Sequence, residues 1–310
     1  MSYPAPTRPP LAILTGPTAV GKTEVSLDVA ERLGTEILSA DSMAVYRRMD
    51  AATAKPSAAA RARVPHHLID LVDPTEPFTV ADYREAAIPI VERLYAEGKR
   101  PLFVGGTRLY LRALTAPFAT GPEPDPELRA RLKEQSTEAL HAELARVDPA
   151  TAAWVHPADR KRIVRALEVW HKTGRPISEV QAESREEGGL YPATWVALVR
   201  DREELYQRVD SRVDEMIRDG LVEEVQGFLH EGLGPDTPAM AGHGYKEIMR
   251  ALLGEYSLDE GIRLLKRNTR RYVKYQLMWL RGMPEVRYVR ADQPHERVVE
   301  EVLRGMNDEG

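Results

Sequence analysis

The sequence has no cysteine, which excludes disulfide bonds, thiolate nucleophiles and zinc–thiolate sites. None of the eight histidines has H-E-x-x-H or a similar spacing of metal ligands, so a structural metal is not expected. No apolar run approaches the ~18 residues of a membrane span, and the first residues lack the basic-then-apolar pattern of a signal peptide. We therefore expect a cytoplasmic protein that does not engage a membrane.

An excess of positive charge is also missing. The chain has 43 Lys and Arg residues against 48 Asp and Glu residues, a formal net charge of −5. Nucleic-acid binding would therefore depend on local clusters of basic residues. With 310 residues, of which 43% are hydrophobic, the chain is long enough for one large domain with an insertion.

The sequence does contain a complete Walker A loop, GPTAVGKT at 16–23. An apolar run at 11–15 predicts a buried strand before the loop, and an amphipathic run at 22–33 predicts a helix after it. Backbone N–H groups of such a loop bind phosphate, the lysine adds charge and the threonine hydroxyl is suited to Mg²⁺. The candidate phosphate-binding residues are Gly16, Pro17, Thr18, Ala19, Val20, Gly21, Lys22 and Thr23. The loop does not specify which phosphate compound binds.

Two further predicted strands end in residues that suit a ligand site. The strand at 36–40 leads to Asp41, and the strand at 102–104 leads to Gly105, Gly106 and Thr107. In a doubly wound sheet, ligands bind at the carboxyl ends of the strands, so Asp41 should share a crevice with the phosphate loop. The glycine pair would let the backbone approach a ligand closely, although a plain turn is an equal alternative.

The predicted fold is α/β, a P-loop NTPase-like parallel-sheet core with an inserted all-helical domain. A proline-rich linker starts at 121, no strand-like run occurs before about 187, and an apolar strand returns at 195–199. We assign 11–120 and 188–303 to the core with its C-terminal helices, 121–187 to the helical insertion, and 1–10 and 304–310 to flexible termini.

Basic residues cluster in three places. Lys161, Arg162 and Arg165 project from one insertion helix, although a solvated face is the commoner explanation. Arg208 and Arg212 share a helix face and suit a diphosphate, with pairing to Glu204 and Asp214 as the alternative. A long helix is predicted over 258–281, and one of its faces carries Arg263, Arg267, Arg270 and Lys274. No acidic residue occurs between Gly261 and Pro284, and such unbalanced positive charge is typical of a surface that binds a polyanion.

Seven segments in order resemble the bacterial tRNA dimethylallyltransferases. They are the GPTAVGKT loop, 41–46 (DSMAVY), 53–56 (TAKP), 65–68 (PHHL), 104–110 (VGGTRLY), 165–169 (RALEV) and 279–281 (WLR). The resemblance covers about 11–288. It implies a P-loop core with a helical insertion that grips the anticodon arm, and transfer of a dimethylallyl group to N6 of adenosine 37 of tRNA.

The same resemblance implies roles for individual residues. The phosphate loop would bind the diphosphate of dimethylallyl diphosphate, with Mg²⁺ held through Thr23. Asp41 would be the general base and Thr107 would hold the target amine, while Lys22, Thr23 and either Arg208 or Arg212 would stabilise the leaving group. The implied tRNA contacts are Asp41, Ser42, Met43, Ala44, Thr107, Arg129, Lys161, Arg162, Arg165, Gly244, Tyr245, Lys246, Lys274, Gln276, Trp279 and Arg281.

This chain departs from the family pattern at three positions. Ala44 stands where a glutamine is frequent, Ala241 where a basic residue is common, and Tyr275 where an arginine is usual. We expect a monomer whose partners are the tRNA anticodon stem-loop and dimethylallyl diphosphate. Two alternatives stay open: a P-loop kinase for a small molecule or nucleotide, and a non-catalytic P-loop RNA-binding module. The sequence does not indicate which tRNAs are modified or how long a prenyl chain fits.

Overall fold

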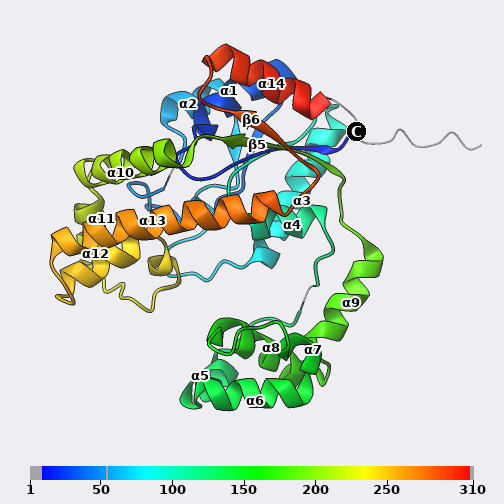
Figure 1. Cartoon of the computed structure of the whole chain (residues 1–310), viewed down its shortest axis with the longest axis vertical. Helices are drawn as coiled ribbons and strands as arrows, with labels where there is room; N and C mark the ends of the chain where they lie inside the picture. The colour runs from blue at the N-terminus through cyan, green and yellow to red at the C-terminus, as the bar shows by residue number, and fades with distance from the viewer. Residues whose placement is uncertain (1–8, 54, 120, 308–310) are drawn as a thin grey trace, which may run out of the picture. The chain divides into compact units, whose positions relative to one another are not determined.

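A six-stranded parallel sheet forms the centre of one compact unit of the protein, with strand order β3-β2-β4-β1-β5-β6 (Figure 1). The computed structural model describes residues 9–53, 55–119 and 121–307. The strands are β1 (Leu11–Thr15), β2 (Ile37–Ser39), β3 (His66–His67), β4 (Leu102–Val104), β5 (Ala193–Val199) and β6 (Val286–Arg290). Because every pairing is parallel, the carboxyl ends of all six strands lie at one edge of the sheet. The predicted α/β class is confirmed.

The central strand β1 is apolar along its length because it is covered on both faces. All five of its residues are buried, and Leu14 lies opposite Val104 on one side and Val196 on the other. The predicted strands at 11–15, 36–40, 102–104 and 195–199 are present, β2 slightly shorter and β5 slightly longer than expected. The sequence analysis missed two edge strands. β3 has only two residues, and β6 is half exposed with two arginines.

Helices of the first unit cover the two faces of this sheet. α1 (Lys22–Leu33) and α14 (His295–Asn307) pack on one face, and α3 (Val80–Ala96) lies on the other (Figure 1). α3 begins with a capping box, in which the side chains of Thr79 and Asp82 each accept a hydrogen bond from the other's backbone N–H. The remaining helices of this unit are α2 (Ala58–Arg63), α10 (Arg202–Arg218), α11 (Leu221–His230), the 3₁₀ helix η1 (Pro238–Ala241), α12 (Tyr245–Leu252) and α13 (Leu258–Arg281).

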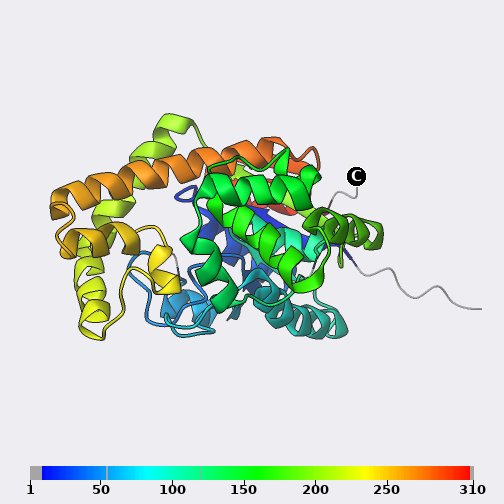
Figure 2. The same cartoon turned by 90° about the horizontal axis from the view of Figure 1, so that it is seen from below.

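The chain forms two compact units, one of Met1–Leu111 with Tyr191–Gly310 and one of Arg112–Leu190. The second unit therefore begins within α4 (Arg108–Thr115), earlier than the boundary expected at 121. Its helices, drawn in green in Figure 2, are α5 (Pro126–Glu134), α6 (Thr137–Val147), α7 (Pro149–Ala152), α8 (Arg160–Thr173) and α9 (Ile177–Glu187). They enclose a separate apolar core that includes Leu140, Leu144, Ile163 and Leu167.

The C-terminal end is more ordered than the sequence indicated. α14 continues to Asn307, and Met306 is buried against the sheet, so the flexible terminus expected from 304 is wrong for 304–307. Residues 1–8 and 308–310 of the expected flexible termini lie outside the described residues. Within the described part of the chain, no helix is both long enough and apolar enough to cross a bilayer.

Candidate active site

The phosphate loop connects β1 to α1 and opens onto a cavity of about 360 Å³ lined by residues 18–24 of the loop and helix start. The Lys22 ammonium donates to the Gly16 and Pro17 carbonyl oxygens at 2.9 and 2.8 Å. Burial lowers the pKa of Lys22 to about 8, while the Asp41 carboxylate opposes this shift and the Arg212 guanidinium adds to it. The loop is thus a cavity of backbone donors with a buried cation beside it.

The two arginines left open by the sequence have different surroundings. Arg208 lines the same cavity and donates through Nε to the Ala19 carbonyl oxygen of the loop at 2.7 Å. The Arg212 Nε is buried, and no described residue accepts a hydrogen bond from it. Burial also lowers the pKa of Arg212. The predicted alternative, pairing with Glu204 and Asp214, is wrong because those carboxylates pair with Arg200 and Lys266.

Asp41 follows β2 and Thr107 follows the neighbouring strand β4, and the side chains of both accept hydrogen bonds from the backbone just after Asp41. Asp41 Oδ1 accepts a hydrogen bond from the Met43 N–H at 2.8 Å, and Thr107 Oγ1 accepts one from the Ser42 N–H at 3.0 Å. No described residue donates to Asp41 Oδ2. The ends of β2 and β4 are therefore tied together, with one carboxylate oxygen left to act on a substrate.

The glycine pair after β4 lets neighbouring parts of the protein pack closely. A Cβ on Gly105 would lie 2.2 Å from the Ala40 carbonyl oxygen, and one on Gly106 would lie 2.3 Å from the Gln276 amide nitrogen. Gly106 also lines the cavity at the phosphate loop. Close packing within the fold therefore requires both glycines, and close approach of a ligand to Gly106 stays a prediction.

A second cavity of about 420 Å³ adjoins the first and is mostly apolar. Five residues line both cavities: Thr18, Asp41, Thr107, Arg212 and Tyr272. Burial raises the pKa of Tyr272 to about 12, with the Asp41 carboxylate adding to the rise, so this phenol stays neutral at physiological pH. The sequence analysis missed Tyr272. Tyr272 lies one turn before Gln276 on the inward face of α13, and this spacing in the sequence could have indicated that its ring faces the site.

The apolar walls of the second cavity also escaped the sequence analysis. They come from five separate parts of the chain that no local motif joins: Tyr46; Phe78; Tyr110; Val209, Val213 and Met216; and Leu265. Predicted tRNA-contact residues Ser42 and Met43 line the same cavity, whereas Ala44 is buried away from it. The cavity therefore has the polarity of a site for an unsaturated hydrocarbon or a heterocyclic base.

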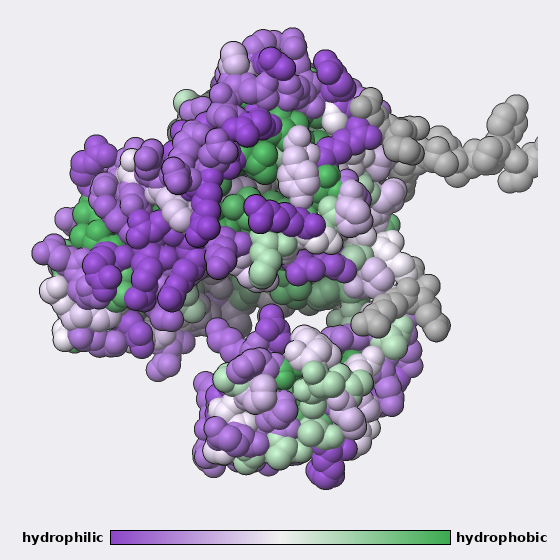
Figure 3. All heavy atoms as spheres, viewed as in Figure 1, coloured by the Kyte–Doolittle hydropathy of each residue, from purple (hydrophilic) through white to green (hydrophobic). Residues whose placement is uncertain are grey.

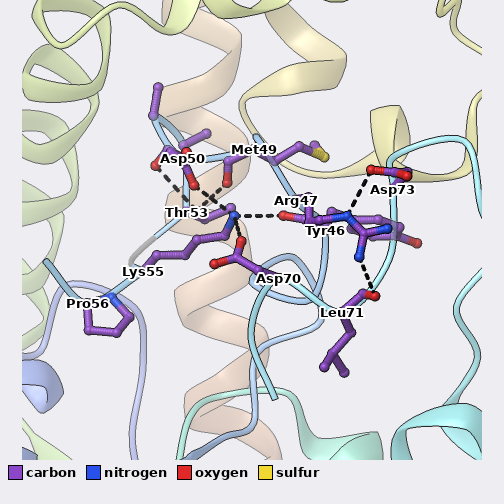
Figure 4. A network of polar contacts seen from close by, with 12 residues as sticks. Tyr46, Arg47, Met49, Asp50, Thr53, Lys55, Pro56, Asp70, Leu71 and Asp73 are labelled. Carbon is purple, nitrogen blue, oxygen red and sulfur yellow. Dashed lines mark hydrogen bonds and ion pairs between the residues drawn. The ribbon is translucent and has the colours of Figure 1, made fainter. Parts of the chain in front are cut away.

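An internal ion-pair network fixes the loop that follows Asp41 (Figure 4). Lys55, with a side chain only 5% exposed, donates to the Tyr46 carbonyl and to the carboxylates of Asp50 and Asp70, each at 2.7 Å. Arg47 donates beside it to Asp73 and to a backbone carbonyl. Because Tyr46 lines the apolar cavity, this network holds one of its walls in place.

The loop at 241–246 presents only part of its predicted RNA contacts to solvent. Lys246 is exposed, but Gly244 is buried and Tyr245 is 0% exposed. The Tyr245 hydroxyl donates to Glu224 at 2.5 Å. A tRNA contact by the Tyr245 side chain is therefore wrong, because that ring belongs to the core between α11 and α12.

Two of the four basic residues of the stripe on α13 are paired with carboxylates. Arg263 pairs with Glu260 of the same helix, and Arg270 pairs with Asp210 of α10 at 2.6 Å. The prediction of an unbalanced stripe is wrong for these two residues, because Glu260 precedes the acid-free segment and Asp210 is sixty residues from Arg270 in sequence. Lys274 and Arg281 are exposed. The face of the first unit seen in Figure 3 is mostly hydrophilic, with scattered apolar patches. Gln276 and Trp279 are 2% and 5% exposed and face inward, so neither side chain is available to RNA.

Two of the insertion's predicted RNA contacts bind a buried carboxylate. Arg129 and Arg165 donate to Glu168, which is 0% exposed, at 2.8 and 2.6 Å. Arg162 pairs with Asp159 at its helix start, and Lys161 is exposed. The pairs hold α5 and α8 together, while the guanidinium groups stay partly accessible, with side chains 38% and 33% exposed.

Comparison with known proteins identifies the family. A family model described as IPP transferase matches residues 44–283. The chain belongs to the IPP transferase family. It is 47% identical over 293 residues to tRNA dimethylallyltransferase of Geobacter sulfurreducens, an alignment that covers 93% of this chain and 94% of the relative. The predicted family is thereby confirmed.

Solved structures agree with this assignment. A full-length tRNA isopentenylpyrophosphate transferase from Bacillus halodurans superposes with a TM-score of 0.72 at 38% identity, covering 95% of this chain and 94% of that one. A eukaryotic dimethylallyltransferase acting on tRNA gives a TM-score of 0.78 at 26% identity, covering 91% of this chain and 73% of the other. The fold of the family thus extends over nearly the whole chain.

Proposed function

We propose that this protein transfers a dimethylallyl group from dimethylallyl diphosphate to N6 of adenosine 37 of tRNA, giving N6-dimethylallyladenosine and diphosphate, and that it acts as a cytoplasmic monomer. One observation carries the proposal. The phosphate loop and the Asp41–Thr107 pair open onto two adjoining cavities that share five residues. A diphosphate in the first cavity would place its allyl group beside Asp41, at the entrance of the second.

The donor half of the reaction requires stabilisation of the leaving diphosphate. The N–H groups of the loop, Lys22 and Arg212 would bind it in a partly dry cavity, where electrostatic stabilisation is most effective. Both candidate arginines line the first cavity, and Arg212 suits this role better because its buried Nε has no described acceptor and it also lines the second cavity, whereas the Nε of Arg208 donates to the Ala19 carbonyl. Thr23 lies at the start of α1 and fits a Mg²⁺ ion that takes its other oxygens from the diphosphate and water. When bound, Mg²⁺ would neutralise the charge that develops on the leaving group.

The acceptor half needs a base, because the exocyclic amine of adenine is a weak nucleophile. The N6–C1 bond forms as the C1–O bond of the donor breaks, and one N6 proton must leave. Asp41 would accept that proton through Oδ2, while its Oδ1 is held by the Met43 N–H. The Thr107 hydroxyl, positioned by the Ser42 N–H, would hold the amine near this carboxylate.

The target base must leave the anticodon-loop stack to reach these groups. Flipping a base out of a single-stranded loop costs less than flipping one from a duplex, and the apolar cavity offers aromatic surfaces from Tyr46 and Tyr110. Exposed Lys246, Lys274 and Arg281 would bind RNA phosphates outside the cavity.

Mass spectrometry of nuclease-digested tRNA tests this function directly. After incubation of unmodified tRNA with the protein, dimethylallyl diphosphate and Mg²⁺, one dimethylallyl group should appear on adenosine 37. The same protein with Lys22→Ala serves as the control. Unmodified tRNA, together with ATP-dependent phosphorylation of a small molecule or nucleotide, would favour the kinase. Bound but unmodified tRNA without phosphorylation would favour the non-catalytic RNA-binding module.

A further inference from the structure

Gln276 is a buried polar side chain that touches the donor site from the helix expected to meet tRNA. It is 2% exposed and lies on the inward face of α13. Its amide oxygen accepts a hydrogen bond from the Thr18 N–H at 2.9 Å, and its amide nitrogen donates to the Gly106 carbonyl at 3.2 Å. One side chain therefore connects α13 to the phosphate loop and to the segment after β4.

The space around this amide is closely filled. A Cβ on Gly106 would lie 2.3 Å from the Gln276 amide nitrogen and 3.4 Å from the Gly16 carbonyl oxygen, so the glycine leaves room for the amide. Gln276 also lines the cavity around the phosphate loop. The amide is thus closely packed against the proposed donor site, and loss of its two partners would leave the Thr18 N–H and the Gly106 carbonyl without these hydrogen bonds.

The first residues of the phosphate loop are held by few side chains. Lys22 donates to the Gly16 and Pro17 carbonyls, and Gln276 accepts from the Thr18 N–H. A bound diphosphate would compete for the Lys22 ammonium and draw it away from these carbonyls. Gln276 would then be the side chain that still holds this half of the loop.

The opposite face of the same helix carries exposed groups. Lys274, Tyr275, Met278 and Arg281 are exposed, within one turn or two of Gln276. A tRNA that contacts this face would restrict the position of α13, and with it the position of the Gln276 amide. The outer face of α13 would thus contact RNA, while its inner face contacts the phosphate loop through Gln276.

We propose that Gln276 is a positioning residue that couples tRNA binding on the outer face of α13 to donor binding in the phosphate loop. A coupling of this kind is reciprocal, so each ligand tightens the other by the same factor, typically about 5- to 150-fold. The inference rests on the proposed function, because it requires that tRNA and a diphosphate bind the same chain.

Calorimetric titration with inorganic diphosphate and Mg²⁺, with and without saturating unmodified tRNA, tests the coupling. We expect the wild-type protein to bind diphosphate at least about fivefold more tightly when tRNA is present. Gln276→Met keeps the length of the side chain but removes both hydrogen bonds, and it should bring this ratio close to one. The same substitution at exposed Gln226 of α11 is the matched control and should leave the ratio unchanged.

The outcomes separate a coupling role from a structural one. Equal loss of diphosphate affinity with and without tRNA in Gln276→Met would preserve the ratio and overturn the inference, as would a wild-type ratio of one. A melting temperature close to wild type and unchanged affinity for tRNA alone establish that the variant is folded. Failure of the wild type to bind diphosphate at all would instead overturn the proposed donor site.

Discussion

The phosphate loop and the basic stripe of α13 differ in how their charges are placed. Lys22 and Arg212 are half-buried cations at the phosphate loop, and desolvation lowers the pKa of both. In the stripe, Arg263 and Arg270 are paired with carboxylates near the surface. A buried cation without an ion partner is costly unless a ligand completes it, whereas an exposed ion pair contributes little to stability. On the proposed function, we expect the chemistry to take place at the loop and Asp41, and affinity for RNA to depend on surface cations such as Lys274 and Arg281, for which no ion pair is found among the described residues.

The largest effect should come from Asp41. Asp41→Asn keeps the size of the side chain but cannot accept a proton, so turnover should fall by ~10² to 10⁴ while donor and tRNA affinity stay near wild type. Single-turnover rates measured beside both dissociation constants check this result.

Asp41 could instead be an outer ligand of Mg²⁺, as acids near phosphate loops often are. The control is a Mg²⁺ series on the same variant, with donor affinity measured at each concentration. A rate that returns as Mg²⁺ is raised would assign Asp41 to the metal and refute its role as base.

Removal of the loop cation should have the next largest effect. Lys22→Ala and Thr23→Ala should each lower the rate of transfer by ~10² to 10³, because leaving-group stabilisation is lost. Filter binding should show tRNA affinity within about twofold of wild type, since remote phosphate contacts supply that affinity. An equal loss of tRNA binding in both variants would contradict the separation of donor and RNA sites.

The buried lysine also predicts a pH dependence. Because burial lowers the pKa of Lys22 to about 8, its ammonium deprotonates in the free protein as pH rises above that value. Donor affinity should be constant from pH 6.5 to 7.5 and should fall up to about tenfold per unit above pH 8. Calorimetry with inorganic diphosphate checks this, and Lys22→Met should abolish the basic limb. A flat profile to pH 9.5 would place the lysine's pKa near its ordinary value.

The smallest effect distinguishes paired from unpaired surface cations. Replacing both Lys274 and Arg281 by alanine should flatten the slope of log tRNA affinity against log salt by about 1.4 to 1.8, at 0.7 to 0.9 per phosphate contact. The matched double variant of Arg263 and Arg270 should change the slope little, because these charges already have carboxylate partners. If the salt-dependence slope were the same for the two double variants, ion pairing would not decide which surface cations bind RNA.

The residues of the candidate donor site could be placed together from the sequence because they lie in local motifs at strand ends. The Walker A loop, Asp41 and Thr107 each follow an apolar strand, and a parallel sheet brings such ends together. The RNA surface was less predictable. Whether Arg270 is paired depends on Asp210, sixty residues away, and whether Gln276 faces RNA depends on which side of α13 packs inward. Tertiary packing decides both, and no local pattern carries that information.

One double-variant comparison tests most directly the claim that chemistry and RNA affinity reside in separate regions. Two quantities are measured for Asp41→Asn, for Lys274→Ala and for the combined variant. They are the single-turnover rate at saturating donor and tRNA, and the dissociation constant of tRNA. The combined variant should have the rate of Asp41→Asn and the tRNA affinity of Lys274→Ala, with the two free-energy changes additive to within about 0.5 kcal/mol. A combined variant whose rate at saturation falls well below that of Asp41→Asn would show that the RNA surface takes part in the chemical step, and would contradict the account.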